Sequence, residues 1–274
     1  MASASWQLSG FGDEIDPDPR VQVAVLHALG ASHIEVRSAW GTNVVDFSSD
    51  QLAQLKQTLV DGSMGVSAIA SPIGKVDVSL PVDHEVQRLG RAIVVAHELD
   101  ARYIRIFSFY SAYESRDAVL ERMRALAALA EREGVVLLHE NEKDIYGDVP
   151  ERVLDVIESV ESDALRVAWD SANFVQVGVR PFTDAYALLR PHLAYLQVKD
   201  AIAATGEVVP TGEGDGQLLE TLAALRDDGY SGFASLEPHL IYSHAFGGFS
   251  GAASFGVATR AFRNATDSIG IELA

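Results

Sequence analysis

Carboxylate side chains stand directly after three strand-like runs in the second half of the chain. Glu140 follows the run Val-Val-Leu-Leu-His, Asp170 follows Arg-Val-Ala-Trp, and Glu237 follows Phe-Ala-Ser-Leu. Carboxylates that converge without a cation repel one another and raise their own pKa values, whereas a divalent ion removes that conflict. The pattern therefore indicates a metal site, provided that the fold brings the ends of these runs together.

A fourth run, Tyr195-Leu-Gln-Val-Lys, lies between the last two of these runs and adds further polar groups. The side-chain period of two places Tyr195, Gln197 and Lys199 on one face of a strand. The amide oxygen of Gln197 thus joins the carboxylates as a fourth oxygen donor. Lys199 either contributes to the same site or forms an ion pair with Asp200 at the strand exit.

The elements that must position these groups alternate regularly along the chain. Short β-branched or aromatic runs give way to Ala/Leu-rich stretches of helical period, with Gly, Pro, Asp or Asn at the joints. Strands are predicted near 6–11, 33–36, 66–70, 103–107, 135–139, 166–169, 195–198 and 233–236. Helices are predicted near 19–29, 49–61, 83–99, 115–133, 149–160, 183–189, 217–228 and 251–265.

Strand–helix pairs of this number in 274 residues predict an α/β protein with one (β/α)8 TIM barrel over residues 1–274. No Gly-x-Gly-x-x-Gly follows the first strand, so a dinucleotide-binding fold has no support. Chemistry in such barrels lies at the C-terminal ends of the strands. We therefore expect Glu140, Asp170, Gln197 and Glu237 to meet at one mouth.

Composition narrows the chemistry and the partners. The chain has no Cys, which excludes thiolate zinc sites, iron–sulfur clusters and disulfides, so metal ligands must be carboxylates, amides or imidazoles. With 21 Lys+Arg against 39 Asp+Glu, the formal charge of −18 disfavours nucleic acid and membrane surfaces as partners. The first residues lack signal-peptide features, and no stretch approaches the roughly 18 apolar residues of a membrane span. We expect a cytoplasmic protein.

Five segments together give the sequence a resemblance to a known family. They are HENEKDIYGD (139–148), WDSANFVQVG (169–178), LQVKDA (196–201), PTGEGDG (210–216) and SLEPH (235–239). In this order and strand placement they resemble the xylose-isomerase-like TIM barrels of sugar and sugar phosphate isomerases and epimerases. That family includes the tagatose/psicose 3-epimerases and the inosose isomerases, and the resemblance runs nearly end to end.

The resemblance implies a divalent metal ion bound by Glu, Asp, His and Glu from the last four strands. By position these ligands are Glu140, Asp170, Gln197 and Glu237, so an amide stands where relatives usually carry an imidazole. An all-oxygen set favours Mn²⁺ or Mg²⁺, with Zn²⁺, Co²⁺ or Fe²⁺ as alternatives. Glu142 replaces Glu140 as the ligand if the strand ends two residues later.

The resemblance also implies isomerisation or epimerisation of a sugar, sugar phosphate or keto-inositol through a metal-stabilised enediolate. Glu140 and Glu237 are the expected catalytic bases, one removing the C–H proton and the other returning it. Lys199 and His239 are expected to hold substrate hydroxyls or a phosphate. Asn173 stands where epimerases usually carry a substrate-binding His, and is a further expected substrate contact.

Glu35, Arg37 and Trp40 lie at or after the end of the second predicted strand and are also expected to contact the substrate. A buried ion pair between Glu35 and Arg105 is the competing interpretation. His139, inside its strand, is expected to be a hydrogen-bonded core residue. Related barrels are often dimers or tetramers, so a homo-oligomer is expected, with the Gly-rich segment 244–256 as its candidate contact.

Three other functions stay open at this point. A metal-dependent dehydratase or lyase acting by β-elimination on a keto-sugar or inosose would use the same ion and bases. An abasic-site endonuclease of the same superfamily needs clustered histidines and a basic face, which eight scattered His and the charge of −18 disfavour. A barrel that became inactive when the usual His became Gln197 would only bind a sugar.

Overall fold

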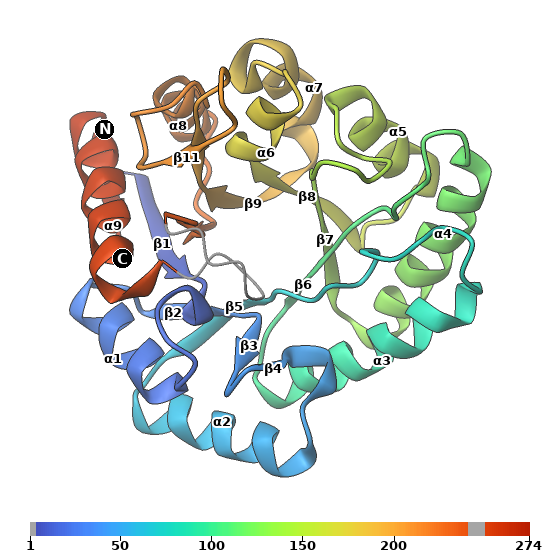
Figure 1. Cartoon of the computed structure of the whole chain (residues 1–274), viewed down its shortest axis with the longest axis horizontal. Coiled ribbons are helices and arrows are strands. Elements are labelled where there is room, and N and C mark those ends of the chain that lie inside the picture. Colours follow the sequence, from blue (N-terminus) through green and yellow to red (C-terminus); the bar gives the residue numbers. More distant parts are fainter. Residues whose placement is uncertain (1–3, 241–249) are drawn as a thin grey trace.

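One curved parallel sheet forms the centre of the protein, whose computed structural model describes residues 4–240 and 250–274. The strand order is β13-β1-β12-β9-β8-β7-β6-β5-β2. An isolated parallel bridge between Phe11 and Glu35 joins the end of β1 to β2, so the curled sheet closes on itself. Figure 1 shows the strands at the centre with the helices around them.

The barrel wall consists of β1 (Ala4–Gly10), β2 (His33–Val36), β5 (Gly65–Ile69), β6 (Tyr103–Ile106), β7 (Val136–Glu140), β8 (Leu165–Asp170), β9 (Leu193–Val198) and β12 (Phe233–Leu236). The helices are α1 (Pro19–Ala28), α2 (Ser49–Asp61), α3 (Val82–Glu98), α4 (Arg116–Glu133), α5 (Pro150–Val160), α7 (Ala187–Leu189), α8 (Leu218–Asp227) and α9 (Gly251–Ser268). Each predicted strand and helix overlaps one of these elements. The prediction of a (β/α)8 barrel is confirmed.

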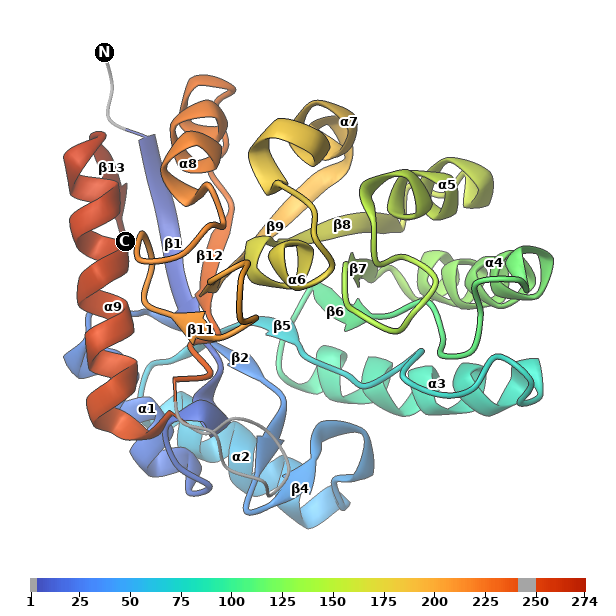
Figure 2. The same cartoon turned by 45° about the horizontal axis from the view of Figure 1, so that its top comes forward.

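Several short elements are absent from the predictions. They are the hairpin β3 (Ser38–Ala39) and β4 (Thr42–Asn43), the hairpin β10 (Asp200–Ala201) and β11 (Val208–Val209), helix α6 (Ser171–Gln176) and strand β13 (Ile271–Leu273), whereas the helical turn η3 (Pro181–Tyr186) overlaps the predicted helix 183–189. These elements have two to six residues, which is too short for a hydrophobic period to show. Strand β13 pairs with Ala4–Trp6 of β1, beside which α9 also runs (Figure 2).

Helix starts and stops follow local side-chain chemistry. Asp18 caps α1 by accepting a hydrogen bond from the backbone N–H of Arg20 at 2.9 Å. Ser48 and Gln51 form a reciprocal capping box at the start of α2. Helix α4 ends at Gly134, whose φ of 72° lies in the left-handed region that glycine adopts without strain. These signals explain why the predicted helix bounds lie close to those of the structure.

The barrel interior is layered. An apolar layer contains four fully buried side chains from four strands, Ala68, Leu138, Ala168 and Tyr195. Because side chains alternate along a strand, the next inward positions of β7, β8 and β9 are Glu140, Asp170 and Gln197. The apolar layer thus supports a polar layer at the C-terminal ends of the strands.

His139 points away from this polar layer. The sequence predicts that it is a hydrogen-bonded core residue, and the hydrogen-bonding part of this prediction is wrong. It is fully buried, and neither ring nitrogen has a hydrogen-bond partner among the described residues. Burial lowers the pKa of His139 to about 4, which keeps the ring neutral. Its ring packs against Gly147, where any side chain would collide with it. His139 therefore fills space beneath the strand end.

Candidate active site

Three carboxylates converge at the mouth of the barrel. Glu140 ends β7, Asp170 ends β8 and Glu237 follows β12, and all three side chains are buried. Each offers an oxygen so placed that the three atoms lie within 4.8 Å of one another. We call Glu140, Asp170 and Glu237 the inner group. Its geometry is that of ligands around one cation.

A cavity of about 220 Å³ opens over the inner group. Nine of the eleven residues that line it are polar or charged, the exceptions being Ala70 and Pro72. Glu140 and Glu237 belong to this lining, together with Lys199 and His239. A small cavity of this kind fits a polyhydroxylated ligand better than an apolar one.

The first turn of α6 fixes the positions of two inner carboxylates. Asp170 Oδ1 accepts a hydrogen bond from the backbone N–H of Asn173 at 2.9 Å and so caps the helix. The amide of Asn173 donates to Glu140 Oε1, also at 2.9 Å. Asn141 makes two hydrogen bonds with the backbone of Asp170, which ties the end of β7 to the end of β8. Asn173 therefore holds the Glu140 side chain in position in this structure.

Two buried cations reach into the inner group. Lys199 Nζ lies 2.8 Å from Asp170 Oδ2 and 3.1 Å from Glu237 Oε2. Arg105 Nη1 lies 3.1 Å from Glu140 Oε2 and 3.8 Å from Glu237 Oε1. Burial would lower the pKa of Lys199, but the charges of Asp170 and Glu237 hold it well above its usual range. Both cations therefore stay charged at neutral pH.

Lys199 does not pair with Asp200, contrary to one of the interpretations of the sequence. Asp200 instead accepts backbone hydrogen bonds from Gly212, Gly214 and Gly216. Side chains at Gly214 or Gly216 would collide with the Asp200 carboxylate. The glycine-rich loop 210–216 is thus a turn held by Asp200. Lys199 pairs instead with Asp170 and Glu237 of the inner group.

The inner carboxylates differ in acidity. Burial raises the pKa of Glu140 to about 8, and the charge of Glu237 adds to this while Arg105 opposes it. Burial also raises the pKa of Asp170. Burial alone would raise the pKa of Glu237, but the charges of Lys199 and its other cationic neighbours together hold it well below its usual range. The site thus contains one carboxyl that retains a proton near neutrality beside one that is ionised.

Gln197 and Glu35 lie next to the inner group. The Gln197 amide donates to Glu35 Oε1 at 3.5 Å, and the Tyr195 hydroxyl donates to Glu35 Oε2 at 2.9 Å. Gln197 Oε1 is buried and accepts no hydrogen bond from residues 4–240 or 250–274. Burial raises the pKa of Glu35 to about 7. The predicted Glu35–Arg105 ion pair does not form, because Arg105 turns toward Glu140.

This arrangement fits a divalent ion on two counts. When ionised, four carboxylates (Glu35, Glu140, Asp170 and Glu237) face three cations (Arg37, Arg105 and Lys199), and Arg37 is shared with Asp13 and Glu14, so negative charge is in excess. The orphaned amide oxygen of Gln197 adds a neutral donor beside them. Oxygen-only donors of this kind suit Mg²⁺ or Mn²⁺.

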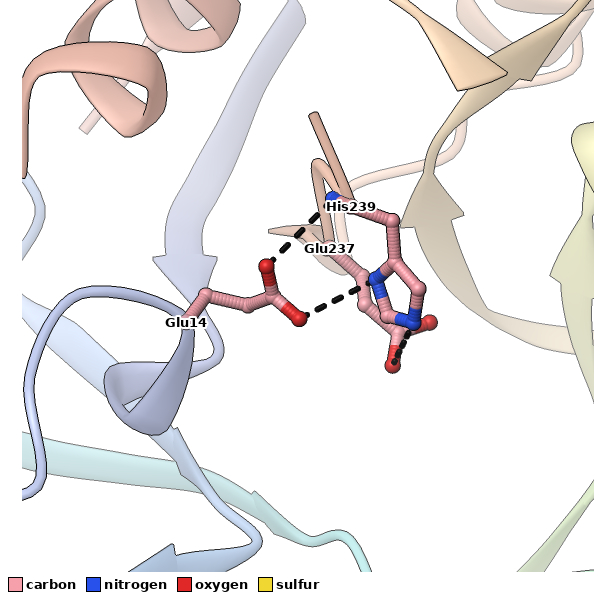
Figure 3. A group of neighbouring side chains, drawn as sticks. All are labelled: Glu14, Glu237 and His239. Atoms are coloured by element: carbon pink, nitrogen blue, oxygen red, sulfur yellow. Dashed lines mark hydrogen bonds and ion pairs between the residues drawn. The ribbon is translucent and has the colours of Figure 1, made fainter. Parts of the chain in front are cut away.

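A second cluster lies beside the first and shares Glu237 with it. Glu14, from the turn η1 (Gly12–Glu14) after β1, lies 3.0 Å from His239 Nδ1, and His239 Nε2 lies 3.9 Å from Glu237 Oε1 (Figure 3). Arg37 contacts Glu14 at 3.0 Å and Glu237 at 2.7 Å. We call Glu14, Arg37, His239 and the shared Glu237 the outer group. Because Arg37 already contacts these carboxylates, the outer group has less need of a metal ion.

The sequence matches the family model described as "Xylose isomerase-like TIM barrel" over residues 23–245. The chain belongs to this family. No curated protein matches the sequence significantly. Among the described residues, no helix has the length and apolar character that crossing a membrane requires.

Solved structures share the xylose isomerase-like barrel over nearly the whole chain. A probable 3-DHS dehydratase, AsbF, from Bacillus anthracis is 18% identical with a TM-score of 0.73, covering 95% of this chain and 99% of that one. A D-allulose 3-epimerase from Methylomonas sp. in complex with D-allulose is 14% identical with a TM-score of 0.72, covering 94% and 96%. A xylose isomerase-like TIM barrel protein from Mycobacterium smegmatis in complex with magnesium is 19% identical with a TM-score of 0.66, covering 98% and 100%. At these identities the likeness concerns the fold.

Some predicted substrate contacts of this xylose isomerase-like barrel lie away from the cavity. Trp40 sits between β3 and β4, where its ring packs edge-on against Phe47 at 6.5 Å, and it is not part of the described cavity lining. Glu35 lies below the lining and contacts Gln197. Glu142, the alternative to Glu140, lines the cavity but pairs with Lys75 at 2.9 Å, outside the inner group.

The sequence predicts no function for three residues that the structure brings to the mouth, Glu14, Asn43 and Lys75. Glu14 lies four residues after the end of β1, in the turn η1, so the strand-end signal that marks Glu140 does not include it. The segment 244–256, expected at a subunit contact, lies largely outside the described residues, and only 250–256 is described.

Proposed function

We propose that the protein is a divalent-metal-dependent isomerase or epimerase of a sugar, sugar phosphate or keto-inositol. The convergence of Glu140, Asp170 and Glu237 beneath a small polar cavity carries this proposal. The named functions of structural neighbours, which include an epimerase in complex with D-allulose, agree with it.

Glu140, Asp170, Gln197 and Glu237 would hold the ion, with Mn²⁺ or Mg²⁺ favoured by their oxygen donors. The ion would supply Lewis-acid stabilisation of the negative charge that develops on two neighbouring substrate oxygens. A neighbour in complex with magnesium supports this choice of metal. Lys199, between Asp170 and Glu237, keeps a fixed positive charge at the floor of the cavity.

Glu140 and Glu237 would transfer the substrate proton. Glu237 is ionised, because its cationic neighbours hold its pKa well below its usual range; it would accept the substrate proton at a carboxylate oxygen, although these cations weaken it as a base. Glu140 would bind the ion weakly or through one oxygen, so that its other oxygen can carry the proton back to the substrate. Return to the opposite face of the same carbon gives epimerisation, and return to the neighbouring carbon gives isomerisation.

Deuterium exchange tests this proposal. The wild type and Glu237→Gln would be incubated in D₂O with a panel of ketoses, inososes and their phosphates, with and without Mn²⁺. We expect Mn²⁺-dependent incorporation of deuterium into one class of substrate, and loss of that incorporation in the variant. Absence of exchange with the whole panel in the presence of metal would contradict the proposed chemistry.

β-Elimination is a second candidate, which the probable dehydratase among the structural neighbours favours. A protonated carboxyl beside an ionised one can protonate a departing hydroxyl after the base has removed the C–H proton. The dehydratase among the structural neighbours has the same fold. Mass spectrometry distinguishes the two reactions, because dehydration lowers the product mass by one water and isomerisation leaves it unchanged.

A further inference from the structure

Glu14 is a fully buried carboxylate that the proposed reaction does not use. Its Oε2 accepts hydrogen bonds from the Ser250 hydroxyl at 2.8 Å, the Ser250 backbone N–H at 3.2 Å and the His239 backbone N–H at 3.3 Å. Its Oε1 lies 3.0 Å from both Arg37 Nη2 and His239 Nδ1. Burial would raise the pKa of Glu14, but His239 and Arg37 lower it, so the carboxylate is ionised.

The His239 ring lies between Glu14 and the cavity. Figure 3 shows Nδ1 directed at Glu14 and Nε2 directed toward Glu237, at 3.0 and 3.9 Å. The ring belongs to the cavity lining, and its side chain keeps 29% exposure, so a ligand can reach Nε2. The backbone of His239 has a φ of 47°, a left-handed conformation that costs energy for a residue with a Cβ.

Glu14 holds both parts of this strained residue. Its two oxygens contact the backbone N–H and the ring of His239, while Ser250 and Arg37 fix the carboxylate itself. The negative charge of Glu14, 3.0 Å from Nδ1, favours a proton on that nitrogen, although the contact does not have hydrogen-bond geometry in this structure. Nε2 is then the nitrogen that is left to face the cavity.

On the basis of the proposed function, we propose that Glu14 is a positioning residue that fixes His239 so that Nε2 contacts a substrate hydroxyl beside the carbon whose proton Glu237 moves. The substrate class is thereby a polyol with a free hydroxyl next to the reacting carbon. This hydroxyl would lie beside Glu237, because Glu237 is the inner carboxylate nearest to Nε2 among the described residues, at 3.9 Å.

The first test measures the protonation of the ring by ¹⁵N NMR, with histidine-labelled protein, and assigns His239 from the signal lost in His239→Gln. We expect Nδ1 of the wild type to carry a proton. Glu14→Gln removes the negative charge that faces Nδ1, whichever way its amide turns between Arg37 and Ser250, so we expect the share of the ring that is protonated at Nδ1 to fall. A wild-type ring protonated at Nε2 alone, or an unchanged signal in Glu14→Gln, would overturn the proposal.

Glu85→Gln is the matched control for this experiment. Glu85 is also buried and lies 3.0 Å from His84 Nδ1, but it is not part of the described cavity lining. The His239 signal should be unchanged in this variant. A change as large as that in Glu14→Gln would show that any buried glutamate affects the ring, and would contradict a specific function of Glu14.

The second test is a double-mutant cycle on kcat and KM, using whichever ketose of the panel exchanges deuterium. Glu14→Gln should raise KM and lower kcat/KM by about 10- to 100-fold, because the contact is misplaced rather than removed. In the His239→Gln background the same change should have almost no further effect. Additive effects would overturn the proposal. If no compound of the panel exchanges deuterium, the proposed function fails, and the NMR result alone decides whether Glu14 orients His239.

Discussion

The inner and outer groups share Glu237 but satisfy their carboxylates in different ways. In the inner group, Asp170 and Glu140 depend on Lys199 and Arg105, and burial raises the pKa of both acids. In the outer group, both oxygens of Glu14 have donors, and its pKa is lowered. Buried carboxylates that lack positive charge are suited to bind a cation.

A carboxylate whose two oxygens both have hydrogen-bond or ion-pair donors supports the structure instead of binding a cation. Glu14 connects the turn after β1 with the end of β12 and the start of α9, and fixes His239 in doing so. The two groups thus show how the same residue type gives either a ligand or a support, depending on the number of donors around it. The following predictions test that distinction.

Removing the shared carboxylate should have the largest effect. Glu237→Gln takes away a proposed base and metal ligand, so we expect deuterium exchange to fall by about 10²- to 10⁴-fold. The rate is measured by NMR at saturating Mn²⁺. Glu85→Gln, a buried change outside the cavity, should keep the wild-type rate. Comparable rates in Glu237→Gln and wild type would exclude Glu237 as the base.

Removing Arg37 should destabilise the fold. Arg37 contacts Asp13, Glu14 and Glu237, and its loss leaves buried carboxylates uncompensated. We expect Arg37→Met to lower the free energy of unfolding by about 3–5 kcal/mol in urea titrations. Arg20→Met breaks an exposed pair with Asp18 and should leave stability nearly unchanged. Equal stability of both variants would refute the structural importance of the outer group.

Replacing the amide ligand should change metal preference. Gln197→His adds an imidazole at the position where the resemblance implies one, and imidazole suits Zn²⁺ better than an amide oxygen does. We expect the Zn²⁺ affinity relative to Mn²⁺ to rise by about tenfold in competition calorimetry. An unchanged ratio would show that position 197 does not contact the ion.

Stability without metal should fall as pH rises from about 5 to 8. The unfolded chain releases the proton of Glu140 near its ordinary pKa of 4.5, whereas the folded protein keeps it up to about 8. Glu35 behaves similarly up to about 7. The folded state therefore binds more protons in this window, and stability present below pH 4.5 is lost as pH rises through the folded-state pKa values.

Thermal unfolding across this pH range checks the sign. Mn²⁺ should raise the melting temperature more at pH 8 than at pH 5.5, because ligands must lose their protons to bind metal. Glu140→Gln should flatten the pH dependence of the metal-free protein. A metal-free melting temperature that increases steadily toward pH 8 would contradict the charge deficit of the inner group.

Much of the barrel mouth can be predicted from the carboxylates that directly follow strand-like runs. Glu140, Asp170 and Glu237 follow runs whose period is visible in the sequence, and neighbouring parallel strands bring such positions together. Glu14 was missed because a short turn separates it from its strand. The partner of Arg105 was mispredicted because several carboxylates converge within its reach, and strand alternation does not choose among them.

Calorimetric titration of metal-stripped protein with Mn²⁺ tests the central claim most directly, comparing the wild type with Asp170→Asn. The variant keeps a side-chain oxygen that can cap α6 but loses the charge that faces Lys199. We predict about one Mn²⁺ per wild-type chain and a large loss of affinity in the variant. No binding by the wild type, or equal binding by both proteins, would contradict the assignment of the inner group as a metal site.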